Sequence, residues 1–236
     1  MKLKKLIVLI LAIILVVSLA ACSGGGGKPP ASSGNNPPSS GGTGGGTGGA
    51  PIDKFEFGVD FIENNLKDNY HIVYEITTYE DNESDTAVME QIWTKEGVYF
   101  AAGGDGMLFI KNGEEYVMYY ETGAGSFEKS PMNYPKEMVE AMISGLSMYM
   151  SAYASFGSEL ARDGSETIAG RDCERYTMDY KYPYLDYKLK YTYCIDKATG
   201  VCLKFKMDVQ GEGKKVGYEF LCTMFKTSGV TLPKYK

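Results

Sequence analysis

Residues 176–209 read YTMDYKYPYLDYKLKYTYCIDKATGVCLKFKMDV, and two turn signals, KYPYLD and DKATG, divide them into three strand-like runs. In an antiparallel pair, the numbers of directly opposed residues add to a constant. A sum of 367 for the first hairpin sets Met178 opposite Leu189, and a sum of 396 for the second sets Tyr193 opposite Leu203. Apolar residues then meet on one face and lysines and threonines on the other, as register selection requires. The stretch therefore predicts three antiparallel strands with one continuous apolar face.

Outside this stretch, the chain predicts more strands and two helices. Short apolar runs between residues 71 and 125 are separated by Gly, Asp and Asn turns, which indicates an antiparallel meander. A short amphipathic helix is expected within residues 55–70. A longer helical segment is expected around residues 135–160, where Pro135 suits a first helical turn and apolar residues recur at three- or four-residue spacings. That apolar stripe either packs on the sheet or forms a methionine-rich wall of a lipid pocket, because methionine adapts to variable shapes.

Residues 1–21 have the pattern of an export signal, with lysines first, an apolar run from Leu6 to Val17, and then small residues. The apolar run is shorter than the roughly 20 residues that a membrane-spanning helix needs. The four residues that end at Cys22, LAAC, resemble the bacterial lipoprotein box. We therefore expect a lipoprotein signal peptide and a diacylglyceryl anchor on Cys22, with palmitate-type acyl chains that hold the protein stably in a membrane. The alternative is an ordinary signal peptide followed by a chance cysteine.

The segment 22–50 is expected to be a flexible tether. After the cysteine it contains 12 glycines, five serines and four prolines among 28 residues, with no aromatic or acidic residue. This composition cannot bury enough apolar surface to offset the entropy of ordering, and a coil of this length reaches roughly 30 Å. Residues 51–236 have a normal size for one domain. The expected localisation is the outer face of the bacterial cytoplasmic membrane, with the domain held there by its lipid.

The charge and the aromatic content narrow the class of partner. Without the three lysines of the signal segment, the formal net charge changes from −6 to −9. Binding to nucleic acid needs basic clusters, so a nucleic-acid partner is not expected. The domain holds all 19 tyrosines and all ten phenylalanines of the chain. Tyrosine at that density favours β-sheet and also surfaces that meet a partly apolar ligand.

Three stretches of the domain resemble one known superfamily. They are GSETIAGRDCERYTMDY (164–180), YTYCIDKATGVCLKFKM (191–207) and FKTSGVTLPKY (225–235). They are similar to the carrier-type bacterial lipoproteins of the LolA/LolB and LppX superfamily, and the resemblance covers most of residues 54–235. It implies an α+β fold: a strongly curved antiparallel sheet, or half-open barrel, with helices packed on or plugging its concave face. It also implies an apolar cavity that holds acyl chains or whole lipids.

The sequence does not predict an enzyme, a cofactor or a metal site. His71 is the only histidine, so a Ser-His-Asp or Cys-His catalytic site would have to use it, and it stands at the head of an expected strand. The His and Cys spacings match no zinc site. The acidic run EDNESD (80–85) lacks the alternating ligands and glycine of a calcium loop, so a solvated turn is expected there.

Four cysteines remain after the proposed anchor. The registers above place Cys173, Cys194 and Cys202 side by side on the polar face of three adjacent strands, within disulfide range. Cys222 extends this row if the last hairpin pairs with a sum of 424, whereas a sum of 425 turns it inward against Leu203. Two bridges, Cys173–Cys194 and Cys202–Cys222, satisfy all four thiols, and Cys194–Cys202 is the competing pair. Disulfides are permitted outside the membrane, although an anaerobic host would keep the thiols free.

The leading functional expectation is a membrane-anchored protein that binds a lipid or another apolar ligand in the half-barrel. The alternative is an envelope sensor or protein-interaction domain with no small-molecule ligand. A hydrolase is the weakest reading because the catalytic constellation is missing. The residues expected to line an apolar site are Tyr74, Ile76, Met138, Met142, Tyr149, Tyr191, Tyr193, Leu203 and Phe205.

Overall fold

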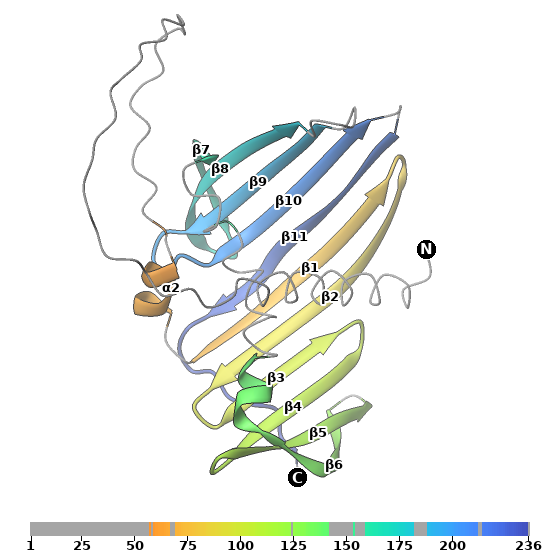
Figure 1. Ribbon diagram of the computed structural model, residues 1–236, viewed down its shortest axis with the longest axis vertical. Coiled ribbons are helices and arrows are strands. Elements are labelled where there is room, and N and C mark those ends of the chain that lie inside the picture. The colour runs from red at the N-terminus through yellow and green to blue at the C-terminus, as the bar shows by residue number, and fades with distance from the viewer. Residues whose placement is uncertain are drawn as a thin grey trace, which may run out of the picture.

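The domain is one large antiparallel sheet (Figure 1). The computed structural model describes residues 57, 59–66, 69–123, 125–141, 153, 159–181, 188–211 and 214–235. The strands are β1 (Tyr70–Glu80), β2 (Glu83–Thr94), β3 (Gly97–Ala102), β4 (Asp105–Asn112), β5 (Glu115–Gly123), β6 (Ser126–Pro135), β7 (Ala161–Ile168), β8 (Arg171–Lys181), β9 (Lys188–Asp196), β10 (Cys202–Gly211) and β11 (Lys214–Lys226).

The sheet consists of two meanders joined along one seam. Its strand order is β6-β5-β4-β3-β2-β1-β11-β10-β9-β8-β7, so the first and the last strand of the chain pair at the centre. Every described pair is antiparallel, and β6 and β7 stand at the two ends of the order. The expected open antiparallel sheet of half-barrel type is therefore confirmed for the described strands.

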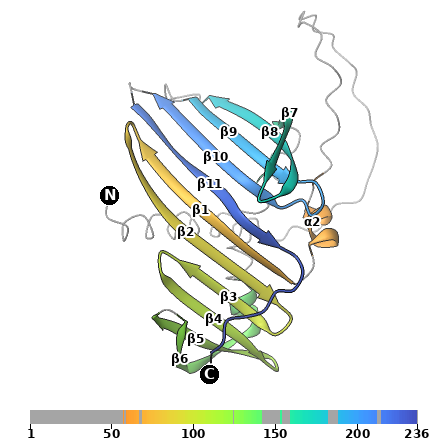
Figure 2. The same ribbon diagram turned by 180° about the vertical axis from the view of Figure 1, so that it is seen from behind.

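The two faces of the sheet carry different covers. The face with Tyr74 and Tyr193 contacts the helical residues, and we call it the helix face. The opposite face carries Ile92, Tyr99 and Leu108, and the chain after β11 lies across it. We call this the tail face, and Figure 2 shows the C-terminal segment crossing β2–β5 there. Both faces are therefore apolar in the half of the sheet that β2–β5 form.

The helical content is small. The expected helix in residues 55–70 is confirmed as α2 (Val59–Asn65), and residues 136–141 are also helical. Ile62 of α2 packs near β8 and β9, while Val139 packs on β3–β5. The expectation of helices that plug the sheet is not confirmed, because these two short pieces are the only α-helices among the described residues. Residues 142–152 and 154–158 of the helical segment expected around 135–160 lie outside the described residues. No helix of the described ranges is both long and apolar enough to cross a membrane.

In the β8–β9 and β9–β10 hairpins, each residue pairs with a partner two positions later in the chain than expected. β8 and β9 pair with a sum of 369, which sets Tyr176 opposite Tyr193. β9 and β10 pair with a sum of 398, which sets Phe205 opposite Tyr193. A slip of two residues preserves the faces, so the predicted apolar face is confirmed although each predicted partner is wrong. The last hairpin pairs with a sum of 425, one of the two expected sums, and sets Phe205 opposite Phe220.

The DKATG turn explains part of this slip. Asp196 closes the turn with its own backbone N–H, which donates to the Val201 carbonyl at 2.9 Å. Cys202 then lies opposite Ile195, and the register shifts once more between Cys202 and Lys204. This shift is a β-bulge with Leu203 as the extra residue, because one residue more is used on β10 than on β9.

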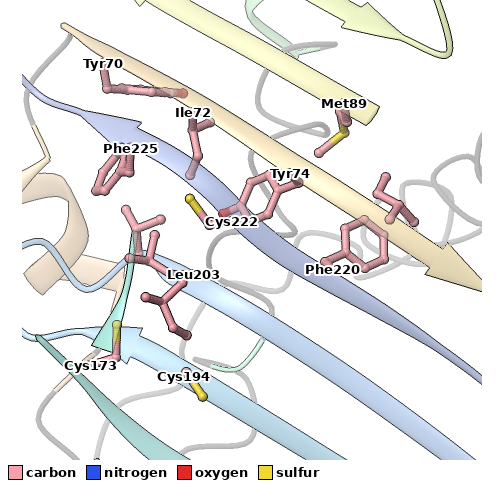
Figure 3. Packing of buried hydrophobic residues seen from close by; sticks show 13 residues of the cluster. Tyr70, Ile72, Tyr74, Met89, Cys173, Cys194, Leu203, Phe220, Cys222 and Phe225 are labelled. Atoms are coloured by element: carbon pink, nitrogen blue, oxygen red, sulfur yellow. The ribbon is translucent and has the colours of Figure 1, made fainter. Parts of the chain in front are cut away.

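None of the predicted disulfides forms among the four described cysteines, whose thiols are free. Figure 3 shows Cys173, Cys194 and Cys222 in the main core. The two-residue slip puts Cys173 opposite Asp196 and Cys194 opposite Arg175, so no two cysteines face each other across a ladder. The β10 bulge turns Cys202 into the cluster under α2 instead of the polar row. Cys222 lies opposite Tyr74 in the main core, as the inward alternative expected.

Candidate functional site

Aromatic side chains form a row across three strands on the helix face. Tyr193 and Phe205 are directly opposed and stacked, with ring centroids 4.9 Å apart. Tyr191 stacks on Phe205 at 6.2 Å, and Tyr218 of β11 meets Phe205 edge-on at 5.4 Å. Phe220 continues the row toward β1, with its ring centroid 5.7 Å from that of Tyr218. We call these five residues the aromatic row.

The alternation of each strand builds this row. Successive side chains of a strand point to opposite faces, so Tyr191 and Tyr193 share the helix face, as do Tyr218 and Phe220. Cross-strand aromatic pairs contribute roughly 0.2–1 kcal/mol each beyond an alanine pair, so the row also stabilises the sheet. The same five residues therefore serve the fold, and a ligand could use only their uncovered parts.

Burial divides the row into a covered and an uncovered part. Tyr193 is 2% exposed, and the ring of Tyr153 lies over it with the centroids 6.2 Å apart. Burial first, and then nearby thiol and phenol groups, raise the pKa of Tyr193 above its ordinary value. Tyr191, Phe205 and Tyr218 are only half-buried. The row is therefore buried at Tyr193 and Phe220 and accessible at Tyr191, Phe205 and Tyr218.

A pocket of about 610 Å³ lies where the row ends, beside the tips of the β1–β2 and β10–β11 hairpins. Its apolar residues are Met207, Val216 and Tyr218, and Val216 is 41% exposed. This volume is in the range of roughly 300–1,000 Å³ that is typical of ligand sites. The polar residues of its lining are Thr78, Tyr79, Glu80, Glu83, Ser84 and Asp85.

Tyr79 borders this pocket, but its side chain lies on the tail face behind it, because Tyr79 alternates with Thr78 and Glu80 along β1. Its hydroxyl donates to a carboxylate oxygen of Asp208, and the ammonium group of Lys206 lies 5.6 Å from the centre of its ring. Burial and the hydrogen bond to Asp208 raise the pKa of Tyr79 above its ordinary value, so it stays a neutral phenol. Tyr79 thus connects β1 with β10 behind the pocket and is not set up as a base.

The sequence-predicted lining residues divide into three groups. Tyr191, Tyr193 and Phe205 come together in the aromatic row. Tyr74, Ile76 and Leu203 are at most 3% exposed and lie in the main core, and the Tyr74 hydroxyl donates to the Cys202 carbonyl at 2.7 Å. Met138 lies in the helical residues 136–141 and is 51% exposed. Met142 and Tyr149 lie outside the described residues, as does Cys22.

Sequence reasoning omitted Tyr218, Met207 and Val216 from its candidate lining. The signal was present, because the sum of 425 already placed Met207 opposite Tyr218 and Val209 opposite Val216. What the sequence lacked was the neighbour on the other side of β11. That neighbour is β1, which brings the acidic hairpin tip next to these residues.

The four described cysteines have the properties of buried structural thiols. Burial is the first cause that raises their pKa, to about 12 for Cys173, Cys194 and Cys222. A thiol is nucleophilic as its thiolate, so a raised pKa makes these groups unreactive.

Nε2 of His71 lies 2.6 Å from a carboxylate oxygen of Glu90 on the neighbouring strand. Within the described ranges, no three His, Cys, Asp or Glu side chains are grouped to hold a metal ion.

A second groove, of about 670 Å³, lies on the other side of the molecule between the β2–β3 turn and the C-terminal tail. Its walls include Lys95, Glu96 and Lys234 as well as Leu232 and Tyr235. Leu232 and Tyr235 also pack on the tail face. The groove is thus the margin of the tail's own packing contact, whereas the aromatic row ends in an open pocket.

Comparisons with known proteins found structural similarity at low sequence identity. One match is a chain from the MucA/MucB complex of Pseudomonas aeruginosa, with 14% identity, a TM-score of 0.36, and coverage of 74% of this chain and 57% of that one. A DUF1329 family protein from Desulfovibrio piger matches with 12% identity and a TM-score of 0.25, over 76% of this chain and 94% of that one. PNGF-II matches with 10% identity and a TM-score of 0.28, over 70% of this chain and 28% of that one. No family model and no curated protein matches the sequence.

Proposed function

We propose that the domain binds a lipid or another apolar molecule on its helix face, along the uncovered part of the aromatic row. The observation that carries this proposal is the continuity of Tyr191, Phe205 and Tyr218 with a pocket of about 610 Å³. All three side chains are half-buried, so each keeps apolar surface in contact with solvent. Covering this surface with a ligand contributes roughly 25 cal/mol per Å².

The proposed activity is binding without chemistry. The uncovered part of the row is apolar, and the polar side chains of the adjoining pocket lie around its edge. Such an arrangement suits recognition, in which apolar surface supplies affinity and a few polar groups orient the ligand. The proposal needs no cofactor and no metal ion.

We further propose that the domain works at a membrane surface. Cys22 would carry the diacylglyceryl anchor, and the glycine-rich segment up to residue 50 would tether the domain to the outer face of the cytoplasmic membrane. An acyl chain or apolar molecule leaving that membrane would then be within reach of the row. Cys22→Ser should abolish labelling of the cell-expressed protein by radioactive palmitate, and persistent labelling would contradict the anchor.

Ligand binding is tested with the full-length chain and a fluorescent fatty acid. Phe205→Ser and Tyr218→Ser remove uncovered parts of the row and should weaken binding at least tenfold. Tyr120→Ser is the matched control, because Tyr120 is a 41% exposed tyrosine on β5 of the same sheet. Urea unfolding of each variant separates loss of the site from loss of the fold. Native mass spectrometry of protein purified without added lipid reports any ligand that is already bound.

Two outcomes would overturn the proposal. One is the absence of any lipid in native mass spectra together with no binding of the fatty acid. The other is binding that is as strong in folded Phe205→Ser and Tyr218→Ser as in Tyr120→Ser.

An interaction domain is the second candidate, and the open sheet favours it. The strands β6 and β7 end the strand order, and Met132 on β6 is 59% exposed. Methionine is enriched at the cores of protein interfaces, so a protein partner could pack on this exposed side chain. Crosslinking in cells from position 132 to a single protein partner, in a variant that binds no fatty acid, would favour this candidate.

A further inference from the structure

We propose that the pocket at the end of the aromatic row selects apolar ligands that carry a cationic head, such as an alkylammonium group. This inference rests on the proposed function and specifies the chemistry of its ligand. Met207, Val216 and Tyr218 form the apolar floor of the pocket. The carboxylates around this floor favour a head group with a positive charge.

The floor of the pocket comes from the two C-terminal strands. Met207 on β10 lies directly opposite Tyr218 on β11. Val216 lies two residues before Tyr218 in the chain, so it takes the same face of the sheet. Val216 is 41% exposed, so apolar surface of the floor is open to a ligand. An alkyl chain lying on Phe205 and Tyr218 would continue onto Met207 and Val216 without crossing a strand.

The rim comes from the β1–β2 hairpin. Glu80 lies opposite Val216 in one ladder and opposite Glu83 in the other. Asp85 lies opposite Thr78, which in turn lies opposite Tyr218. Because opposed residues share a face, the backbone register puts all three acidic positions on the helix face beside the apolar floor. All three residues line the pocket and are exposed.

Glu80 and Glu83 lie directly opposite each other across the β1–β2 ladder. Like charges directly opposite each other in an antiparallel pair are destabilising. A cation held between the rim and the floor would reduce this repulsion, and its attraction to the carboxylates would exceed that in bulk water because the floor is apolar. An anionic head in the same place would add to the repulsion.

Basic residues also lie near this end of the sheet. Lys206 pairs with Asp208 at 3.1 Å and belongs to the tail face, behind the pocket. Lys214 and Lys215 begin β11, directly before Val216. The experiment therefore includes these two lysines, whose removal should strengthen the preference for a cation.

The test measures calorimetric binding of three ten-carbon amphiphiles to the full-length chain, each below its micelle concentration. Decyltrimethylammonium should bind about fivefold tighter than decyl glucoside and at least tenfold tighter than decyl sulfate at low salt. The difference should shrink at 0.5 M salt, because exposed charges are screened. The double change Lys214→Gln with Lys215→Gln should widen this difference in affinity.

Matched variants assign the preference to the rim. Glu80→Gln, Glu83→Gln and Asp85→Asn together should bring the three affinities within about twofold while decyl glucoside binding is unchanged. Asp105→Asn with Glu114→Gln neutralises exposed acids at other turns and should keep the preference. Equal affinities in the unmodified chain, or a cation preference that survives the triple change, would overturn the inference and leave the proposed function standing. Binding of none of the three amphiphiles would overturn both.

Discussion

Asp196 connects the β9–β10 turn to two other parts of the molecule. It is 1% exposed, and one carboxylate oxygen accepts hydrogen bonds from the Thr199 backbone N–H at 3.0 Å and the Thr199 hydroxyl at 2.5 Å. The same oxygen accepts a hydrogen bond from Nη2 of Arg171 at 2.7 Å. Arg171 lies over the ring of Phe225, 4.9 Å from its centre. One carboxylate therefore connects the β9–β10 turn, the β7–β8 turn and the end of β11.

Replacing Asp196 should be strongly destabilising. Asp196→Ala leaves the guanidinium of Arg171 without its carboxylate. The pair is only partly buried, since the Arg171 side chain is 23% exposed, so the cost in the free energy of unfolding should be about 3 kcal/mol, the lower end of the range for buried pairs. Asp163→Ala is the control, because it breaks an exposed pair with Arg175 and should cost under about 1 kcal/mol. Urea unfolding monitored by circular dichroism measures both. Equal losses in the two variants would contradict the role given to Asp196.

Glu166 is the centre of a second polar cluster, on the tail face. Its carboxylate accepts hydrogen bonds from the Lys204 ammonium at 3.1 Å and from the Cys194 thiol at 3.4 Å. Burial acts to raise the pKa of Glu166, but the hydrogen bond and charge of Lys204 outweigh it, and the pKa lies below its ordinary value. The folded state therefore favours the ionised carboxylate.

This shift gives Glu166 a defined effect of pH on stability. A carboxylate whose pKa is lowered by folding contributes stability above its unfolded pKa, and the contribution is lost as the pH falls through the folded pKa. Glu166→Gln should thus be less stable than the unmodified chain at pH 7, and the two should converge as the pH falls below about 4.5. Urea titrations between pH 3 and pH 7 measure the difference. A difference that grows toward low pH would contradict the ion pair.

At the scale of elements, the C-terminal tail acts as the cover of the tail face. Val230, Leu232 and Tyr235 pack against the cluster of Ile92, Tyr99 and Leu108, and the Tyr235 ring lies 4.9 Å from that of Tyr119. Because the tail covers this face, strands β2–β4 carry apolar residues on both faces of the sheet. A sheet with one solvated face would show polar residues at half of these positions.

Shortening one side chain of the tail should measure the strength of this cover. Leu232 is half-buried, so Leu232→Ala should cost roughly 1–2 kcal/mol, less than the 2–5 kcal/mol that is typical of a fully buried leucine. Lys234→Ala removes an exposed neighbour and should change the free energy of unfolding by under about 0.5 kcal/mol. Urea unfolding of the two variants tests this, and an unchanged stability in Leu232→Ala would show that the tail does not hold the face.

Strands were more predictable from the sequence than their exact partners. Alternation fixes which face a residue takes, and the faces of Tyr193, Phe205 and Met178 were all predicted correctly. The pairing depends on how many residues each turn uses, and the carboxylate of Asp196 and the bulge at Leu203 alter that count. A slip of two residues keeps like opposite like, so the apolar pattern could not detect it. The free cysteines follow directly from this slip.

At the scale of the whole molecule, the pairing of β1 with β11 decides the site. These strands lie about 150 residues apart in the chain, and their ladder runs from His71 with Lys226 to Glu80 with Val216. It places the acidic tip of one hairpin beside the apolar end of another. Local pattern predicted both hairpins but not their adjacency, because the pairing of distant strands leaves no periodic signal in the sequence. Tyr218, Met207 and Val216 were missing from the predicted lining for that reason.

The open ends of the sheet raise the question of self-association. β6 carries Lys129 and Pro131, and its register with β5 shifts twice, so its outer edge is irregular. β7 is bulged near Gly164, whose φ is +104°. Charges, prolines and bulges are the devices by which natural sheets prevent edge-to-edge pairing. The sheet is therefore built to remain open without joining a second copy.

The full-length chain with Cys22→Ser, which carries no acyl chain, should accordingly stay monomeric at about 10 μM in light-scattering chromatography. Replacing Lys129 and Pro131 by valine restores donors and apolar surface to the β6 edge, and these changes should produce dimers or larger species. Lys111→Val with Glu114→Val is the control, because it adds similar apolar surface at the β4–β5 turn, away from an edge. Association of the control to the same extent would mean that added hydrophobicity, and not the edge, drives pairing. A dimer already present in the Cys22→Ser chain would contradict the protective role of both edges.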